Sequence, residues 1–178
     1  MKDLMIYLKT TETCNLNCAH CFTSGVNGRK IYFNTDKIID WFKRMKDVFP
    51  SFRTAHIDFH GGEPFLAPIQ DMQKVYDEVS KLYPEMSWGT TTNLVYKITD
   101  EKLNFMRTAL NKRVGTSWDP KIRFANDKQK QLWENNVRKL IHNLRSENTI
   151  LIVTHEPNLF QDLPSKILTL NRGKIEFL

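Results

Sequence analysis

Short apolar runs alternate with longer segments of helical periodicity along most of the chain. Runs rich in β-branched and aromatic residues predict strands at 5–9, 55–59, 87–92, 113–117 and 149–154. Apolar residues recur at helical spacing and predict helices at 35–48, 71–83, 100–109 and 128–144. Near the end, 167–170 and 174–177 flank a turn-forming Asn-Arg-Gly and predict a hairpin.

Strands that alternate with helices in this way are typical of βαβ units and a parallel sheet. At 178 residues, the chain is shorter than the roughly 250 residues of a closed eight-stranded α/β barrel. The pattern therefore predicts an α/β fold, an open and partial (βα) barrel with about five or six parallel strands inside and helices outside. We expect a single domain over residues 1–178, with a short C-terminal extension at 154–178.

The composition is that of an ordinary globular protein, with 40% hydrophobic and 26% charged residues. No signal peptide precedes the first strand and no apolar run is long enough to span a bilayer. We therefore expect a cytoplasmic protein without a membrane partner. The net charge of +6 suits an acidic partner such as nucleic acid, a nucleotide or an acidic peptide. This support is weak, because the basic residues are scattered as on any solvated surface.

All three cysteines of the chain lie on one short segment, at Cys14, Cys18 and Cys21. An odd, clustered set in a chain without a signal peptide predicts a metal site rather than a disulfide framework. Three thiolates can ligate three irons of a 4Fe–4S cluster, and the absence of a fourth cysteine leaves one iron for another ligand. The alternative is a zinc site completed by His20 or another histidine, although structural zinc sites usually use paired C-x2–4-C units.

The C-x3-C-x2-C spacing resembles the cluster motif of the radical S-adenosylmethionine (SAM) enzymes. In that superfamily an aromatic residue usually precedes the last cysteine. Here this position holds His20, and Phe22 follows the cysteine. A second segment, Gly61-Gly62-Glu63-Pro64, resembles the superfamily's GGEP motif and ends the second predicted strand. The resemblance covers residues 5–153. It implies a 4Fe–4S cluster on the three cysteines, with SAM bound to the open iron.

The GGEP segment also has a physical interpretation. Glycine at positions 61 and 62 allows the backbone to approach a ligand closely, because no Cβ is in the way. Glu63 can accept a charge-assisted hydrogen bond, and the resemblance assigns the amino group of SAM as its donor. The alternative is a plain turn, with Glu63 at the N-terminus of a helix.

Two further strand ends resemble cofactor contacts of the superfamily. Asn93 follows the third strand and resembles the Thr-Asn pair that many relatives place beside the methionine or ribose of SAM. Ser117 and Asp119 follow the fourth strand and resemble the Ser-x-Asp of relatives related to sulfatase-maturing enzymes. There these residues commonly reach the ribose hydroxyls or the carboxylate. Pro120 is expected to halt regular structure after this motif.

One contact of those relatives has no clear counterpart. They carry an arginine further along, on the following helix, that grips the SAM carboxylate. In this chain Arg123 comes too early for that position, and Lys128 and Lys130 cannot make the bidentate contact of an arginine. The residue that fills this role is left open by the sequence.

The histidines are weaker candidates. His60 precedes the GGEP segment and is a candidate for the substrate pocket. His155 ends the predicted fifth strand and is a second candidate. His56 lies on the second strand and is expected to pack in the core.

The resemblance implies an enzyme in which an external one-electron reductant, flavodoxin- or ferredoxin-like, supplies an electron. SAM is then cleaved to methionine and a 5′-deoxyadenosyl radical, which abstracts hydrogen from the substrate. The substrate is expected to be a peptide or a nucleotide-like molecule. Two alternatives stay open: activation of a glycyl-radical partner, and a truncated or inactive core that binds a cluster without turnover.

Overall fold

The computed structural model of the chain describes residues 4–19, 21, 25–49, 55–117, 120–144, 168–171 and 174–177. The chain divides into two units, Met1–Asn148 and Thr149–Leu178. In the second unit, β5 (Leu168–Asn171) and β6 (Lys174–Phe177) pair as an antiparallel hairpin, as the sequence predicts. The predicted strand at 149–154 lies outside the described residues. That strand and the single domain over 1–178 stay predictions.

Four parallel strands form the sheet of the first unit, in the order β1-β2-β3-β4. They are β1 (Leu4–Thr11), β2 (Ala55–Gly61), β3 (Ser87–Thr91) and β4 (Val114–Gly115). Each strand pairs with the next one along the chain, which is the arrangement of consecutive βαβ units. The described sheet does not close on itself. The prediction of an open α/β fold with the character of a partial barrel is therefore confirmed.

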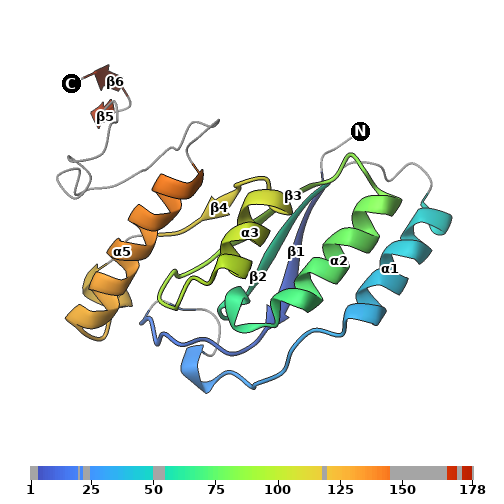
Figure 1. Cartoon of the computed structure of the whole chain (residues 1–178), viewed down its shortest axis with the longest axis horizontal. Helices are drawn as coiled ribbons and strands as arrows, with labels where there is room; N and C mark the ends of the chain where they lie inside the picture. The colour runs from blue at the N-terminus through green and yellow to red at the C-terminus, as the bar shows by residue number, and fades with distance from the viewer. Residues whose placement is uncertain are drawn as a thin grey trace. The chain divides into compact units, whose positions relative to one another are not determined.

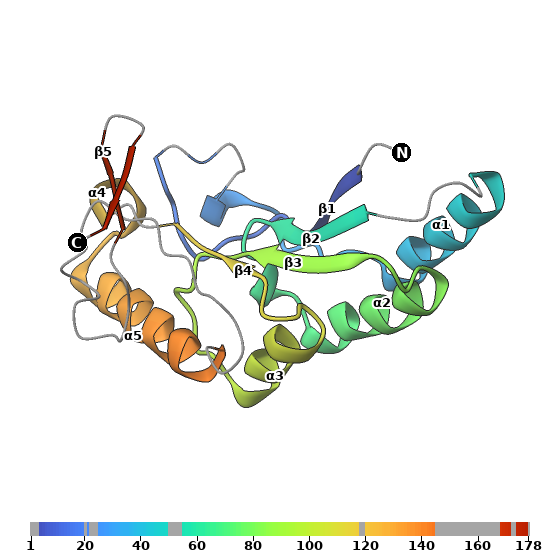
Figure 2. The same cartoon turned by 90° about the horizontal axis from the view of Figure 1, so that it is seen from above.

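The longer helices of this unit lie on one side of the sheet (Figures 1 and 2). They are α1 (Thr35–Val48), α2 (Ile69–Leu82), α3 (Asp100–Thr108) and α5 (Asp127–Leu144). The starts of two of them are fixed locally: the side chain of Asn34 accepts a hydrogen bond from the Lys37 N–H, and that of Thr99 accepts one from the Lys102 N–H.

The side of the sheet that faces these helices is apolar. Ile57 and Phe59 of β2 and Trp88 of β3 are buried. Phe59 stacks on Trp88 with ring centroids 5.4 Å apart and contacts Phe105 of α3 at 5.8 Å. Because side chains alternate along a strand, the neighbouring residues of β2 and β3 point to the opposite side, which these helices do not cover.

The region after β3 differs from expectation in two details. β4 pairs over only two residues, Val114 and Gly115, instead of 113–117. Pro120 begins the short helix α4 (Pro120–Arg123) rather than halting regular structure. Proline suits the first helical position, since its fixed φ is helical. An N–H at that position would have no intrahelical acceptor, so its absence in proline costs nothing.

Candidate functional site

The candidate site lies at the edge where all four strands of the sheet end. Parallel strands bring their carboxyl ends together, and ligands of α/β proteins bind in the loops that follow. The cysteine segment follows β1, the GGEP segment follows β2, Asn93 follows β3 and Ser117 follows β4. The topology thus gathers at one edge the segments that the sequence predicts to act together.

The two glycines of the GGEP segment let two stretches of backbone pack together. Gly61 has a φ of 145°, and a Cβ on Gly62 would lie 2.0 Å from the carbonyl oxygen of Thr13. The Gly62 N–H donates to the Thr11 carbonyl and the Glu63 N–H to the Thr13 carbonyl, each at 2.9 Å. The close approach expected for a ligand is here made by the start of the cysteine segment.

Glu63 is fully buried, and its carboxylate accepts hydrogen bonds from three protein donors. These donors are the Phe65 N–H at 3.0 Å, the Thr92 hydroxyl at 2.7 Å and the Asn93 N–H at 2.7 Å. Burial raises the pKa of Glu63 to about 7, although the three donors act in the opposite direction. Glu63 therefore ties the turn at η2 (Pro64–Leu66) to the end of β3. The expected contact with SAM's amino group stays a prediction.

Asn93 extends this network to the cysteine segment. Its side-chain N–H2 donates to Cys14 Sγ at 3.4 Å and to Asn15 Oδ1 at 2.8 Å, and its Oδ1 accepts the Val95 N–H at 2.8 Å. Asn15 in turn donates to the Val95 carbonyl. Asn93 is thus placed beside a cysteine, while its expected contact with SAM stays a prediction. Asn15 was missed, since nothing in the sequence marks one residue inside the C-x3-C spacing.

Each cysteine is partly exposed, and none forms a disulfide. The Cys14 N–H donates to the Gly25 carbonyl at 3.1 Å, at the start of η1 (Gly25–Asn27), and the Cys21 N–H donates to the Cys18 carbonyl at 3.0 Å. Cys14 Sγ also accepts the Leu16 N–H at 3.4 Å. Burial raises the pKa of the Cys14 thiol above its ordinary value.

These residues fit an iron–sulfur cluster by their chemistry. Thiolate is the usual protein ligand of such clusters, and N–H donors to the sulfur stabilise its negative charge. Cys14 already has two such donors, from Leu16 and Asn93. Within the described part of the chain, no three Cys, His, Asp or Glu side chains are grouped closely enough to hold a metal ion as they stand.

Ser117 and Arg123 contact each other, and Arg123 lies beside the second cysteine. The Arg123 guanidinium donates to Ser117 Oγ, and the Cys18 thiol lies 3.9 Å from the Arg123 carbonyl oxygen. Nε of Arg123 is buried, with no hydrogen-bond partner in the described structure. Because Arg123 ends the short helix α4, it lies at this edge of the sheet, although it precedes the position at which the relatives carry their arginine.

Four predicted site residues, His20, Phe22, Asp119 and His155, lie outside the described residues. His60 ends β2 beside the GGEP turn, and its ring contacts that of Tyr7 edge-on, with centroids 5.5 Å apart. The expectation that His56 packs in the core is wrong. Its side chain is 25% exposed, on the side of the sheet away from the helices, and Nδ1 lies 2.8 Å from Ser87 Oγ.

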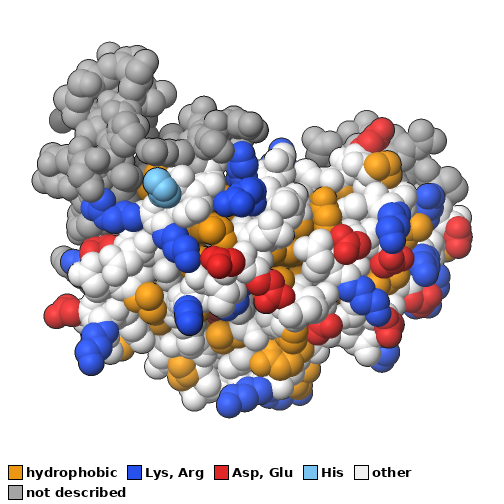
Figure 3. Space-filling view, viewed as in Figure 1, with side chains coloured by type: hydrophobic (Ala, Val, Ile, Leu, Met, Phe, Trp, Pro, Cys, Tyr) orange, Lys and Arg blue, Asp and Glu red, His pale blue; other side chains and the backbone are white. Residues whose placement is uncertain are grey.

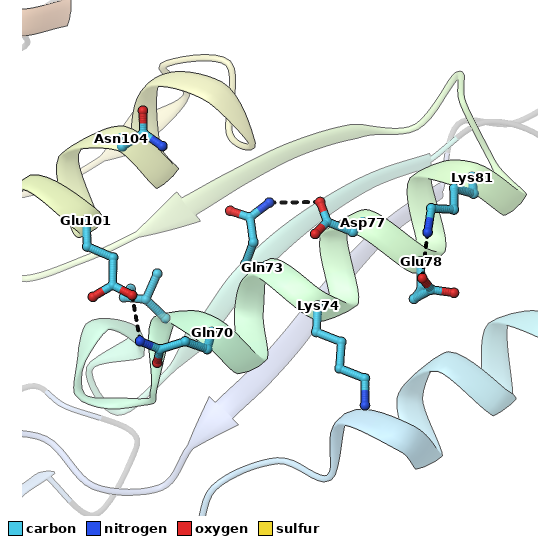
Figure 4. A pocket seen from close by; sticks show the side chains of 9 residues that line it. Gln70, Gln73, Lys74, Asp77, Glu78, Lys81, Glu101 and Asn104 are labelled. Carbon is cyan, nitrogen blue, oxygen red and sulfur yellow. Dashed lines mark hydrogen bonds and ion pairs between the residues drawn. The ribbon is translucent and has the colours of Figure 1, made fainter.

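A hollow of about 370 Å³ lies on the outer helical layer, away from this edge (Figure 4). The side chains around it satisfy one another: Gln70 donates to Glu101, Gln73 to Asp77, and Lys81 pairs with Glu78. Figure 3 shows Lys and Arg interspersed with Asp and Glu over this face. Such a mixed surface is not the continuous basic patch that nucleic acid would need. None of the described helices is long and apolar enough to pass through a membrane.

Comparison with known proteins identifies the family. The model of the family described as "4Fe-4S single cluster domain" matches residues 5–142. Because this match covers most of the chain, the chain belongs to that family. The prediction of a single 4Fe–4S cluster is confirmed at this level.

Individual proteins that this chain resembles are longer than it is. The chain is 30% identical over 122 residues to the uncharacterized protein MJ0907 of Methanocaldococcus jannaschii, covering 67% of this chain and 39% of that protein. Histidine-tagged anSMEcpe with bound AdoMet, a radical SAM sulfatase maturase, matches with a TM-score of 0.64 and 22% identity, over 82% of this chain and 42% of that one. Native anSMEcpe with bound AdoMet and Cp18Cys peptide matches with a TM-score of 0.60 and 18% identity, over 81% and 41%. The chain thus spans about two fifths of the length of these relatives.

Proposed function

We propose that this chain is the catalytic core of a radical SAM enzyme that modifies a peptide. The observation that carries the proposal is the continuous hydrogen-bonded path from Glu63 through Asn93 to Cys14. It links the motif expected to bind SAM to the segment expected to bind the cluster, and the Asn93–Cys14 contact joins residues 79 positions apart in the sequence. When bound, the cluster supplies the electron that cleaves SAM and yields a 5′-deoxyadenosyl radical.

In this proposal the cysteine segment binds the cluster, and the GGEP turn has a separate positioning role. Cys14, Cys18 and Cys21 hold the cluster, and Asn93 donates to the first of these sulfurs. Glu63 fixes the turn at Gly61–Gly62, whose backbone packs against the start of the cysteine segment. Since this carboxylate is buried and bonded to three protein donors, we assign it first a positioning role.

Arg123, with Ser117 beside it, binds the carboxylate of SAM in this proposal. A carboxylate suits the guanidinium group, which offers several N–H donors in one plane. The buried Nε without a described hydrogen-bond partner supports this assignment, since a bound carboxylate would satisfy it. Arg123 thereby takes the role that the sequence leaves open. Asp119, His20 and Phe22 are proposed to complete the pocket.

A peptide substrate is favoured because a structure of similar fold holds a peptide together with AdoMet. A nucleotide-like substrate is the second candidate, and the net charge of +6 is the observation that favours it. The electron donor is proposed to be flavodoxin- or ferredoxin-like. Three cysteines outside any disulfide fit a reducing compartment such as the cytoplasm.

Anaerobic reconstitution tests this function directly. We expect about four iron and four sulfide per chain and, with SAM and a strong reductant, release of 5′-deoxyadenosine. Cys18→Ala is the control, because two remaining cysteines cannot hold three irons. One zinc per chain without broad visible absorbance would refute the cluster. A full cluster that never cleaves SAM would indicate an inactive core.

A further inference from the structure

The sheet face opposite the helices is unusually polar for a parallel sheet. Parallel sheets are normally covered on both faces and carry apolar residues on both. Here β2 directs Ala55, Ile57 and Phe59 to the helices, but it directs His56, Asp58 and His60 to the other face. We name the latter the open face. A central strand with three polar side chains on one face indicates that something polar occupies that face.

Asp58 is the centre of this face. It is 7% exposed, yet it points away from the helices, and its Oδ2 accepts the Thr91 hydroxyl at 3.0 Å. The ion-pair contact found for it among the described residues is with His56, whose Nε2 lies 3.9 Å from Oδ1. No described Lys or Arg lies within ion-pair distance of this carboxylate. Desolvation raises the pKa of Asp58, while Thr91, His56 and His60 act in the opposite direction.

Neighbouring residues hold Asp58 and His56 together. Both side chains lie over Gly89 of β3, where an added Cβ would come within 2.9 Å of His56 Nε2 and 3.1 Å of Asp58 Oδ1. Ser87 fixes the other imidazole nitrogen of His56 at 2.8 Å. The pair is therefore oriented by partners on β3 and shaped by the absence of a side chain at position 89.

We propose that Asp58 and His56 bind a cationic side chain of the peptide substrate, an amine or a guanidinium. A mostly buried carboxylate without a strong counter-ion is stabilised when a cation reaches it. Glu12, a second carboxylate near this edge, already accepts a hydrogen bond from Arg29 at 2.8 Å, and Glu63 is bonded to three protein donors. This inference rests on the proposed function, since it assumes that a substrate enters over the open face.

The position of Asp58 on β2 suits an anchor rather than a reacting group. Asp58 precedes Gly61 by three residues, which corresponds to about 10 Å along a strand. A lysine or arginine side chain bound at Asp58 would thus extend toward the loops at the carboxyl edge. The reacting carbon would lie near that edge, and the bound cation would set which peptide position is presented.

Binding of short peptides to the reconstituted protein tests this proposal. The probes are N-acetyl-Gly-X-Gly-amides in which X is arginine, lysine, citrulline, norleucine or glutamate, and their affinities are measured by isothermal titration calorimetry. We expect the arginine and lysine peptides to bind at least about tenfold more tightly than the neutral ones. Asp58→Asn keeps the shape and the Thr91 bond, and should remove that preference.

Two further variants keep the test decisive. Asp36→Asn makes the same chemical change on α1, where Asp36 pairs with Lys74, and should leave peptide binding unchanged. Thr91→Val removes the hydroxyl that orients Asp58 and should weaken the cation preference even if Asp58→Asn fails to fold. Equal binding of charged and neutral peptides to the wild-type protein would overturn the proposal.

SAM cleavage separates this proposal from the function on which it rests. If the protein releases 5′-deoxyadenosine but shows no preference for cationic peptides, the radical SAM activity is supported and the Asp58 site is rejected. Asp58-dependent binding of the arginine peptide to a protein that never cleaves SAM would support the site and reject the radical SAM activity.

Discussion

The GGEP turn and the cysteine segment lie at the same edge of the sheet but are built in opposite ways. In the turn, Glu63 is fully buried and its carboxylate accepts hydrogen bonds from three protein donors. In the cysteine segment all three thiols are partly exposed, and no ready-made metal geometry is found among the described residues. The turn is therefore part of the folded core, whereas the three cysteine side chains stay accessible to a ligand. Mutations in the two regions should differ most in their effect on the metal-free protein.

Gly62→Ala should have the largest effect on the stability of the metal-free protein. The added Cβ would lie 2.0 Å from the Thr13 carbonyl oxygen, and backbone atoms cannot move aside as a side-chain tip can. We expect a loss of about 4 kcal/mol or more in the free energy of unfolding. Urea denaturation measures it. Gly115→Ala is the matched control, since its Cβ would have no neighbour closer than 3.6 Å. Equal losses in both variants would contradict a specific role for Gly62.

Glu63 should make stability depend on pH. Its pKa is raised by burial from 4.5 to about 7 in the folded protein, so the folded state binds its proton more tightly than the unfolded state does. The stabilisation is complete below pH 4.5 and is lost as the pH rises through 7, by about 3 kcal/mol. Glu63→Gln cannot titrate and should flatten the profile over this interval. A profile that keeps its slope in the variant would show that another group is responsible.

Asn93→Leu should cost less stability but change the cluster. Loss of its hydrogen bonds leaves Asn15 and the Val95 N–H without their partner. We expect this to lower the free energy of unfolding by about 1–3 kcal/mol. It also removes one N–H donor from Cys14 Sγ. Since such donors stabilise the reduced cluster, the midpoint potential should become more negative. A redox titration followed by EPR measures the shift. An unchanged potential at full cluster content would indicate that the Asn93–Cys14 contact does not persist once iron is bound.

Cys18→Ala should have the smallest effect on the metal-free protein, within about 0.5 kcal/mol, because it truncates a partly exposed side chain. The same variant should fail to bind the cluster. Iron content and urea denaturation of the metal-free chain give the two readouts. A large loss of stability without metal would show that the cysteine segment is as much a part of the core as the GGEP turn.

Periodicity and motif spacing predicted what is local in this protein. The four helices, the first three strands and the terminal hairpin each depend on neighbouring residues, and the Cys and GGEP motifs are short runs. The contacts that join the motifs were not predictable. Asn93 meets Asn15 across 78 residues, and no local pattern specifies such a partner. The prediction that His56 packs in the core is wrong because Asp58 and His60 share its side of β2, and a carboxylate there argues against an apolar environment.

Backbone contacts join the two ends of the loop that carries the three cysteines. Thr11 at the end of β1 forms an antiparallel bridge with Tyr32, and the Phe33 N–H donates to the Thr10 carbonyl at 2.9 Å. The entropy of closing this loop is thus lost when the chain folds, before any iron arrives. All three thiols are tethered to one short closed segment, where effective concentrations are on the order of millimolar. After the first iron–thiolate bond forms, the remaining two are intramolecular steps whose rates do not depend on protein concentration.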